Sequence, residues 1–166
     1  MTTTTSTDNL RRHRTRWQTA AWVGLLLLGG FYLFGATNDL IADGRTGIPT
    51  DHTGTFTSMA DIGWDAAQHT IPGTAAYITL LERGYALHEL VYAILFLTIL
   101  AIPFRHRQRW AWFACWTPTI ANFGYALTFG AHDTAIGYRS LIALIALPVL
   151  LLAHIPAFFI RHAGTR

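Results

Sequence analysis

Residues 84–104 read GYALHELVYAILFLTILAIPF, and residues 105–109 follow at once as RHRQR. The first stretch is almost continuously apolar and has about the 20 residues that an α-helix needs to cross about 30 Å of hydrocarbon. Three further apolar stretches of similar length lie at 17–38, 110–131 and 140–160. The sequence therefore predicts an all-α integral membrane protein, a four-helix bundle in which every helix crosses the bilayer.

The composition agrees with this prediction. Hydrophobic residues make up 52% of the 166 residues and charged residues only 13%, whereas soluble domains contain about 25% charged residues. Apolar residues before the quoted stretch extend the second span to 75–104. We expect residues 1–16 to form a disordered basic tail and residues 17–166 to form one transmembrane domain, with an acidic extracellular loop at 39–74.

The arginines predict the orientation of the chain. All twelve basic residues are arginine, and nine of them share one side of the membrane if the chain crosses it four times. An excess of arginine in short segments marks the cytoplasmic side. We therefore expect both termini in the cytoplasm. The basic segments serve as topology signals and attract anionic lipids, and nucleic acid is not expected as a partner.

Polar residues occur in the second span at positions where lipid should exclude them. Glu82, Tyr85, Glu89 and Tyr92 are separated by three, four and three residues, which puts them on one face of a helix. Ionisable groups at membrane depth are costly and indicate a functional site by default. We expect this face to point into the bundle, with His88 next to it.

Residues of the third and fourth spans reach the same depth. Asn122 and Tyr125 lie about 13 Å and 9 Å below the outer boundary if that boundary is near residue 131. The polar groups therefore converge on the outer half of the bundle, below the acidic loop. The candidate ligand-binding residues are Glu82, Arg83, Tyr85, Tyr92, Asn122, Tyr125, His132 and Arg139.

Three interpretations of this zone remain open. It can be a hydrogen-bonded network that only fixes helix packing, since interhelical hydrogen bonds contribute about 0.6 kcal/mol each. It can be a pocket for a small molecule or a lipid head group. It can also be a catalytic site in which Glu89 and His88 transfer protons, because a carboxyl group in an apolar pocket suits acid–base chemistry.

The remaining histidines predict neither haem nor a metal site. His88 and His154 differ in depth by about 14 Å, too much for both to ligate one haem. His52, His69 and His132 lack the spacing of a zinc site, and we expect them to be solvated loop residues. We therefore expect no cofactor and no bound metal.

One segment resembles a known group. The sequence IPFRHRQRWAWFACW at 102–116 resembles the turn between spans two and three in DoxX-like small four-helix membrane proteins of bacteria, and Arg83 followed by Gly84 resembles their start of span two. Gln108 stands where those proteins show glycine. The resemblance covers about residues 70–120 and implies four spans in a bacterial plasma membrane. It implies little about activity.

We therefore expect a small polytopic membrane protein without catalytic activity. It would bind a lipid-like molecule, or support a membrane complex or homo-oligomer, through the polar pocket in the outer leaflet. Membrane lipids are its expected surroundings. The alternative is a membrane enzyme that acts on a lipid, quinone or isoprenoid. A channel or transporter is less consistent with four short helices that lack a charge pair at the midplane.

Overall fold

The computed structural model describes the backbone of residues 4–160 and the side chains of residues 16–160, and within that range it contains helices and turns but no strand. The predicted all-α fold class is therefore confirmed. The helices are α1 (Thr4–Arg45), α2 (His52–Ala60), α3 (Trp64–Thr70), α4 (Pro72–Ile99), the π-helical turn η1 (Leu100–Phe104), α5 (Arg109–Ala114), α6 (Thr117–Thr128), the 3-10 turn η2 (Phe129–Ala131), α7 (Thr134–Leu152) and α8 (Ile155–Phe159).

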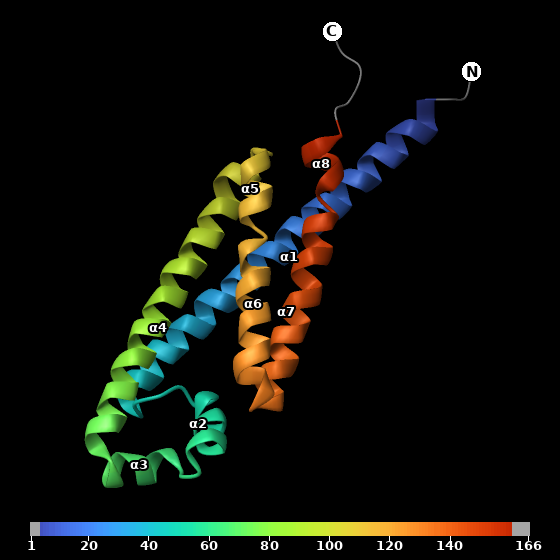
Figure 1. Ribbon diagram of the computed structural model, residues 1–166. Coiled ribbons are helices and arrows are strands. Elements are labelled where there is room, and N and C mark those ends of the chain that lie inside the picture. Colours follow the sequence, from blue (N-terminus) through green and yellow to red (C-terminus); the bar gives the residue numbers. More distant parts are fainter. Residues whose placement is uncertain (1–3, 161–166) are drawn as a thin grey trace.

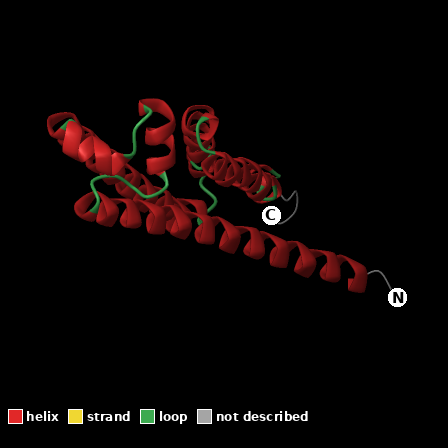
Figure 2. Cartoon of the chain, turned by 90° about the horizontal axis from the view of Figure 1, so that it is seen from below, coloured by secondary structure: helices red, strands yellow, loops and turns green. Residues whose placement is uncertain are grey.

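The long helices run side by side between two ends of the molecule. α4 packs along α1, and α7 packs against both α6 and α1. The turn from η1 to α5 lies at the same end as α8, and we call this the turn end (Figure 1). α2 and α3 lie at the opposite end, which we call the loop end. Seen from below, α1 is one long helix that extends beyond the others at its N-terminal side (Figure 2).

Among the described residues, three segments are long and apolar enough to cross a membrane: Arg16–Arg45, Pro72–Phe104 and Thr134–Phe159. They correspond to the first, second and fourth predicted spans. The third predicted span, 110–131, is instead divided into α5, α6 and η2, each too short to cross alone. The break falls at residues 115–116, just before Pro118, whose ring cannot donate a backbone hydrogen bond and favours the first turn of a new helix.

Two boundaries differ from the sequence-based expectation. α1 continues to Arg45, past the predicted end at Asn38, so Asp39 and Asp43 belong to a helix rather than to a loop. α1 also covers residues 4–16, for which we expected a disordered tail, while residues 1–3 lie outside the described range.

The two ends of the molecule have separate cores. The larger core lies toward the turn end and is built around Leu25, Leu100, Phe104, Leu147 and Leu151, all almost fully buried. The smaller core belongs to the loop end. There Ile48 and Trp64 pack on Ala67 and Ala75, so the connection between α1 and α4 is a folded cap rather than a free loop. Two helices form in this cap, α2 and α3, and Asp61 between them adopts a left-handed conformation (φ 56°).

Candidate functional site

The polar groups predicted to converge meet at the loop end, and their centre is a residue of the cap. His52 is the first residue of α2 and only 3% of its surface is exposed. Its Nδ1 atom lies 2.9 Å from Oε2 of Glu82 on α4, and its Nε2 atom contacts the Tyr125 hydroxyl on α6. Its ring also stacks on Phe129, with centroids 4.8 Å apart. One side chain therefore joins the cap to two long helices. The expectation that His52 is solvated is wrong.

The local sequence explains why α2 reaches this position. Gly47 adopts φ 92°, a conformation that side chains disfavour. The Thr46 hydroxyl donates to the Ile48 carbonyl at 2.9 Å, and the Trp64 indole donates to the Thr46 carbonyl at 2.7 Å. These bonds reverse the chain after α1 and fix it on the small core. His52 then starts α2 beside Glu82 of α4 and Tyr125 of α6.

Further contacts fasten α2 to the start of α7. Arg139 donates to Asp51 at 3.2 Å, in an exposed ion pair. A Cβ atom at Gly54 would lie only 2.7 Å from Oδ2 of Asp133, so glycine lets α2 approach closely here. Asp133 is the N-cap of α7 and accepts from the backbone of Ala135 and Ile136. α2 is thus held by α4, α6 and α7 together.

Two tyrosines and a second acidic residue, Glu89, extend the cluster from His52 toward the middle of the helices. The rings of Tyr85 and Tyr125 stack almost in parallel, 6.3 Å apart. Glu89 interacts with the Tyr85 hydroxyl and with the carboxyl group of Asp39 on α1. The face of α4 that carries Glu82, Tyr85 and Glu89 is therefore directed toward α1, α2 and α6. We call Asp39, Asp43, His52, Glu82, Tyr85, Glu89 and Tyr125 the loop-end cluster.

Two other predicted residues form separate contacts nearer the middle of the helices. The Tyr92 hydroxyl donates to Oγ1 of Thr117 at 3.1 Å. Asn122 donates to the Tyr32 hydroxyl at 2.8 Å and to the Pro118 carbonyl at 2.8 Å. These bonds join α4 to α6 and α6 to α1. They have the character of helix-packing contacts, the first of the three interpretations.

The structure does not bring the remaining candidates into the cluster. His88, Arg83 and His132 are exposed. Arg139 lies at the rim, bound to Asp51. His88 and Glu89 are neighbours on one helix and so point about 100° apart. The histidine within the cluster is His52 rather than His88.

Asp43 is the least satisfied group of the cluster. It lies in the last turns of α1 with 2% of its surface exposed, yet neither carboxylate oxygen accepts a hydrogen bond from the described residues. Its charge interacts with those of Glu82, His52 and Arg83. The hydroxyl of Thr55, one turn after His52, is also buried and unpaired within the described part of the chain. A buried carboxylate without partners costs several kcal/mol, about 3 or more.

Acidic groups outnumber basic groups in this region. Five carboxyl groups lie in or beside the cluster, those of Asp39, Asp43, Asp51, Glu82 and Glu89, and Asp51 is bound by Arg139. Burial alone would lower the pKa of His52, but its hydrogen bond to Glu82 and the charges of Glu82, Asp51 and Asp39 raise that pKa above its usual value. The site is therefore arranged to hold positive charge.

The described residues contain no group of three histidine, cysteine or acidic side chains arranged to hold a metal ion. No protein family, curated protein or solved structure matches this chain. The site must therefore be interpreted from its own geometry.

His52 and Asp43 were missed because both depend on chain reversal after α1, which hydropathy does not report. One feature of the sequence did indicate that the acids of α4 need a partner from another segment. Glu82 and Glu89 share one helix face, and the one arginine of α4, Arg83, is the sequence neighbour of Glu82 and so points about 100° away from it. A partner had to come from elsewhere, and the long segment before α4 was the nearest source.

Proposed function

We propose that this chain is a four-span bacterial plasma-membrane protein with both termini in the cytoplasm and the loop end outside. In this arrangement α5 and α6 together make the third crossing, with the break at residues 115–116 buried against α7 and α8. The support is the separation of charge. Arg105, Arg107 and Arg109 lie at the turn end, whereas the acids gather at the loop end.

We further propose that the protein is a binding protein, and that the loop-end cluster binds the cationic head group of a lipid-like molecule. The observation that carries this proposal is Asp43, a buried carboxylate with no hydrogen-bond donor among the described residues, in a cluster where acids outnumber cations. A cation beside Asp43 would offset the cost of its burial.

The aromatic side chains favour an alkylammonium group as that cation. Tyr85, Tyr125 and Phe129 form a continuous stack next to His52. Aromatic faces attract ammonium and quaternary ammonium groups by about 0.5–2 kcal/mol. The apolar remainder of the ligand would lie against outward-facing residues such as Val91 and Phe123, which the helices expose toward lipid.

Thermal unfolding in a neutral detergent tests this function with dodecyltrimethylammonium as the probe. We expect the probe, below its micellar concentration, to raise the unfolding midpoint of the wild-type protein. Asp43→Asn keeps the shape of the side chain and removes its charge, so apparent affinity should fall about tenfold. The matched control is Asp65→Asn, because Asp65 is exposed on α3. Equal midpoint shifts in both variants would refute cation binding at Asp43.

A catalytic role is the second candidate, and one observation favours it. Glu89 faces both Asp39 and Tyr85, so two carboxyl groups and a phenol lie where protons can be exchanged. Such an enzyme would use Glu89 as the base, with His52 in the place we first expected for His88. Glu89→Gln separates the candidates. It should abolish turnover of a lipid, quinone or isoprenoid substrate if the site is catalytic, and leave probe binding at Asp43 intact if it is not.

A further inference from the structure

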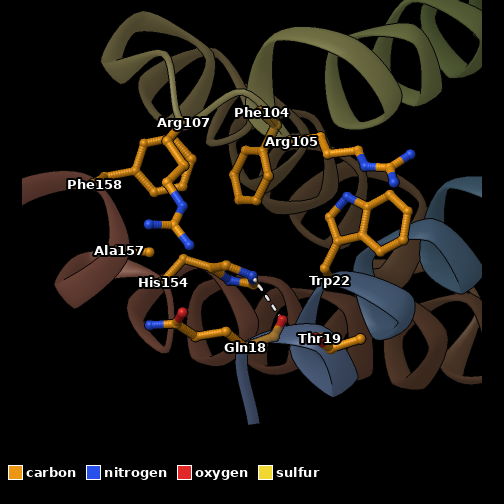
Figure 3. Close-up of a pocket in the computed structure, with 9 residues that line it drawn as sticks. All are labelled: Gln18, Thr19, Trp22, Phe104, Arg105, Arg107, His154, Ala157 and Phe158. Atoms are coloured by element: carbon orange, nitrogen blue, oxygen red, sulfur yellow. Dashed lines mark hydrogen bonds between the residues drawn. The ribbon is translucent and has the colours of Figure 1, made fainter. Parts of the chain in front are cut away.

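The turn end carries a second site that is independent of the loop-end cluster. A pocket of about 140 Å³ opens between the start of the apolar part of α1, the η1–α5 turn and α8. Figure 3 shows Arg107 reaching from the turn toward His154 and Gln18, whereas Arg105 extends over Trp22 on the other side of Phe104. No acidic residue lines this pocket among the described side chains.

The wall of the pocket is fixed by its own hydrogen bonds. Both ring nitrogens of His154 face backbone carbonyls, that of Leu150 at 2.8 Å and that of Gln18 at 3.1 Å. The indole nitrogen of Trp22 donates to the Leu100 carbonyl at 3.0 Å. These groups are occupied and shape the pocket without offering donors to a ligand.

The free donors are the two guanidinium groups. Arg105 lies over the Trp22 ring at 5.7 Å, a cation–π contact that holds its position. Arg107 extends toward Ala157 and His154 (Figure 3). Neither guanidinium forms an ion pair or hydrogen bond with the described residues. The two groups put positive charge on both sides of the pocket, and each guanidinium can donate paired N–H bonds to the oxygens of a phosphate.

The backbone at Arg107 explains how this side chain is positioned. The amide of Gln108 donates to the Pro103 carbonyl at 3.0 Å and that of Arg107 to the Phe104 carbonyl at 2.9 Å. This is the Schellman pattern of a helix end, and it puts Arg107 at the left-handed position, with φ 57°. Glycine adopts this conformation at lower cost. The helix end therefore holds Arg107 in this conformation, and from there its side chain points into the pocket (Figure 3).

We propose that this pocket binds a phosphate group, supplied by the head group of an anionic phospholipid in the leaflet at the turn end. Trp22 and Trp110 lie nearby, and tryptophan favours the level of lipid head groups. Basic pockets between transmembrane helices on the cytoplasmic side bind anionic head groups. The inference needs the turn end to lie at a membrane surface, but it does not depend on any ligand at the loop-end cluster.

The test compares three arginine variants of the full chain in neutral detergent, with unfolding midpoint against ligand concentration as the readout. Arg107→Gly and Arg105→Gln each remove one guanidinium from the pocket. Arg107→Gly should leave the unliganded midpoint unchanged or raise it, because glycine fits the left-handed position. Arg109→Gln is the matched control, since Arg109 lies in the same turn but over the Phe159 ring, outside the pocket.

We expect phosphatidylglycerol to stabilise the wild-type protein more than phosphatidylcholine does, and each pocket variant to bind it about tenfold more weakly. Inorganic phosphate alone should stabilise far less. Equal protection by inorganic phosphate would overturn the lipid head group as the source. Equal loss in Arg109→Gln and Arg107→Gly would overturn the pocket itself, because it would show attraction to net charge only.

Discussion

His52 is the single side chain that most strongly fixes the geometry of the loop end. Its two ring nitrogens and its ring face are all occupied, by Glu82, Tyr125 and Phe129. Removing a partner from a buried charged group costs more than the hydrogen bond itself contributes, because the remaining group stays desolvated. The cap therefore depends on this residue more than on its exposed ion pair between Asp51 and Arg139, which contributes about 0–1 kcal/mol.

Replacement of His52 by alanine tests this. We expect His52→Ala to lower the free energy of unfolding by about 2–4 kcal/mol, since it leaves Glu82 without its donor and removes the stack on Phe129. Unfolding in detergent, followed by tryptophan fluorescence, gives the value. His69→Ala, an exposed histidine of α3, should change stability by less than about 0.5 kcal/mol. Similar losses in both would contradict the assigned role of His52.

The same side chain predicts a dependence on pH. The pKa of His52 is raised in the folded protein, so the folded state binds its proton more tightly than the unfolded state does. The added stability is complete below the ordinary histidine pKa of about 6.5 and is lost as pH rises through the higher folded value. The midpoint difference between wild type and His52→Ala should therefore shrink from pH 6 toward alkaline pH, roughly over the interval set by these two pKa values. A constant difference would contradict this.

The site was only partly predictable at this scale. The helical period put Glu82, Tyr85 and Glu89 on one face, because neighbours three and four apart on a helix share a side. The structure does place these three side chains in the cluster. Their partners His52, Asp43 and Asp39 come from α1 and the cap, across a chain reversal. Periodicity is a local signal and cannot report that contact.

At the scale of elements, close approach of backbones fixes how α6 and α7 meet. A Cβ atom at Gly130 would lie 2.9 Å from the Cα atom of Gly137, and backbone cannot move aside as a flexible side chain can. This contact closes the short connection between α6 and α7 through η2. It thereby fixes the positions of Tyr125 and Phe129 next to His52. The close packing of small residues is a common basis of helix association in membranes.

Alanine at Gly130 should therefore separate the two helices. We expect Gly130→Ala to destabilise the protein by about 1–3 kcal/mol. The matched control is Gly124→Ala in the preceding helix, α6, where an added Cβ atom meets nothing within 4 Å. That change should be neutral or slightly stabilising, because alanine favours helix by up to about 1 kcal/mol. Both values come from unfolding in detergent. A neutral Gly130→Ala would contradict the close contact.

The helix boundaries predicted from hydropathy agree with the structure for some helices and differ for others, and each difference has a physical reason. Hydropathy located α4 with η1 and α7 with α8, since their apolar runs are long and uninterrupted. It ended α1 too early, because Asp39 and Asp43 are polar although their backbone is helical. It also did not predict that α5 and α6 would become separate helices, because the break comes from Pro118 within an otherwise apolar stretch.

At the scale of the whole molecule, the charges are sorted between two ends. The turn end presents arginines around a pocket, and the loop end presents carboxyl groups next to a folded cap. This separation of charge gives a chemical reason for where each proposed ligand would bind. A cation would bind at the acidic loop end and a phosphate at the basic turn end. Both proposals require that the two ends face opposite surfaces of one membrane.

Labelling of single cysteines in intact cells tests that requirement most directly. The one native cysteine, Cys115, is fully buried, and Cys115→Ala gives a background without thiols. A membrane-impermeant maleimide should label Asp65→Cys and His132→Cys in intact cells, and Arg107→Cys only after the membrane is opened. His132→Cys distinguishes four crossings from three, because it follows α6. Labelling of Arg107→Cys from outside, or of His132→Cys only from inside, would contradict the four-span arrangement with the loop end outside.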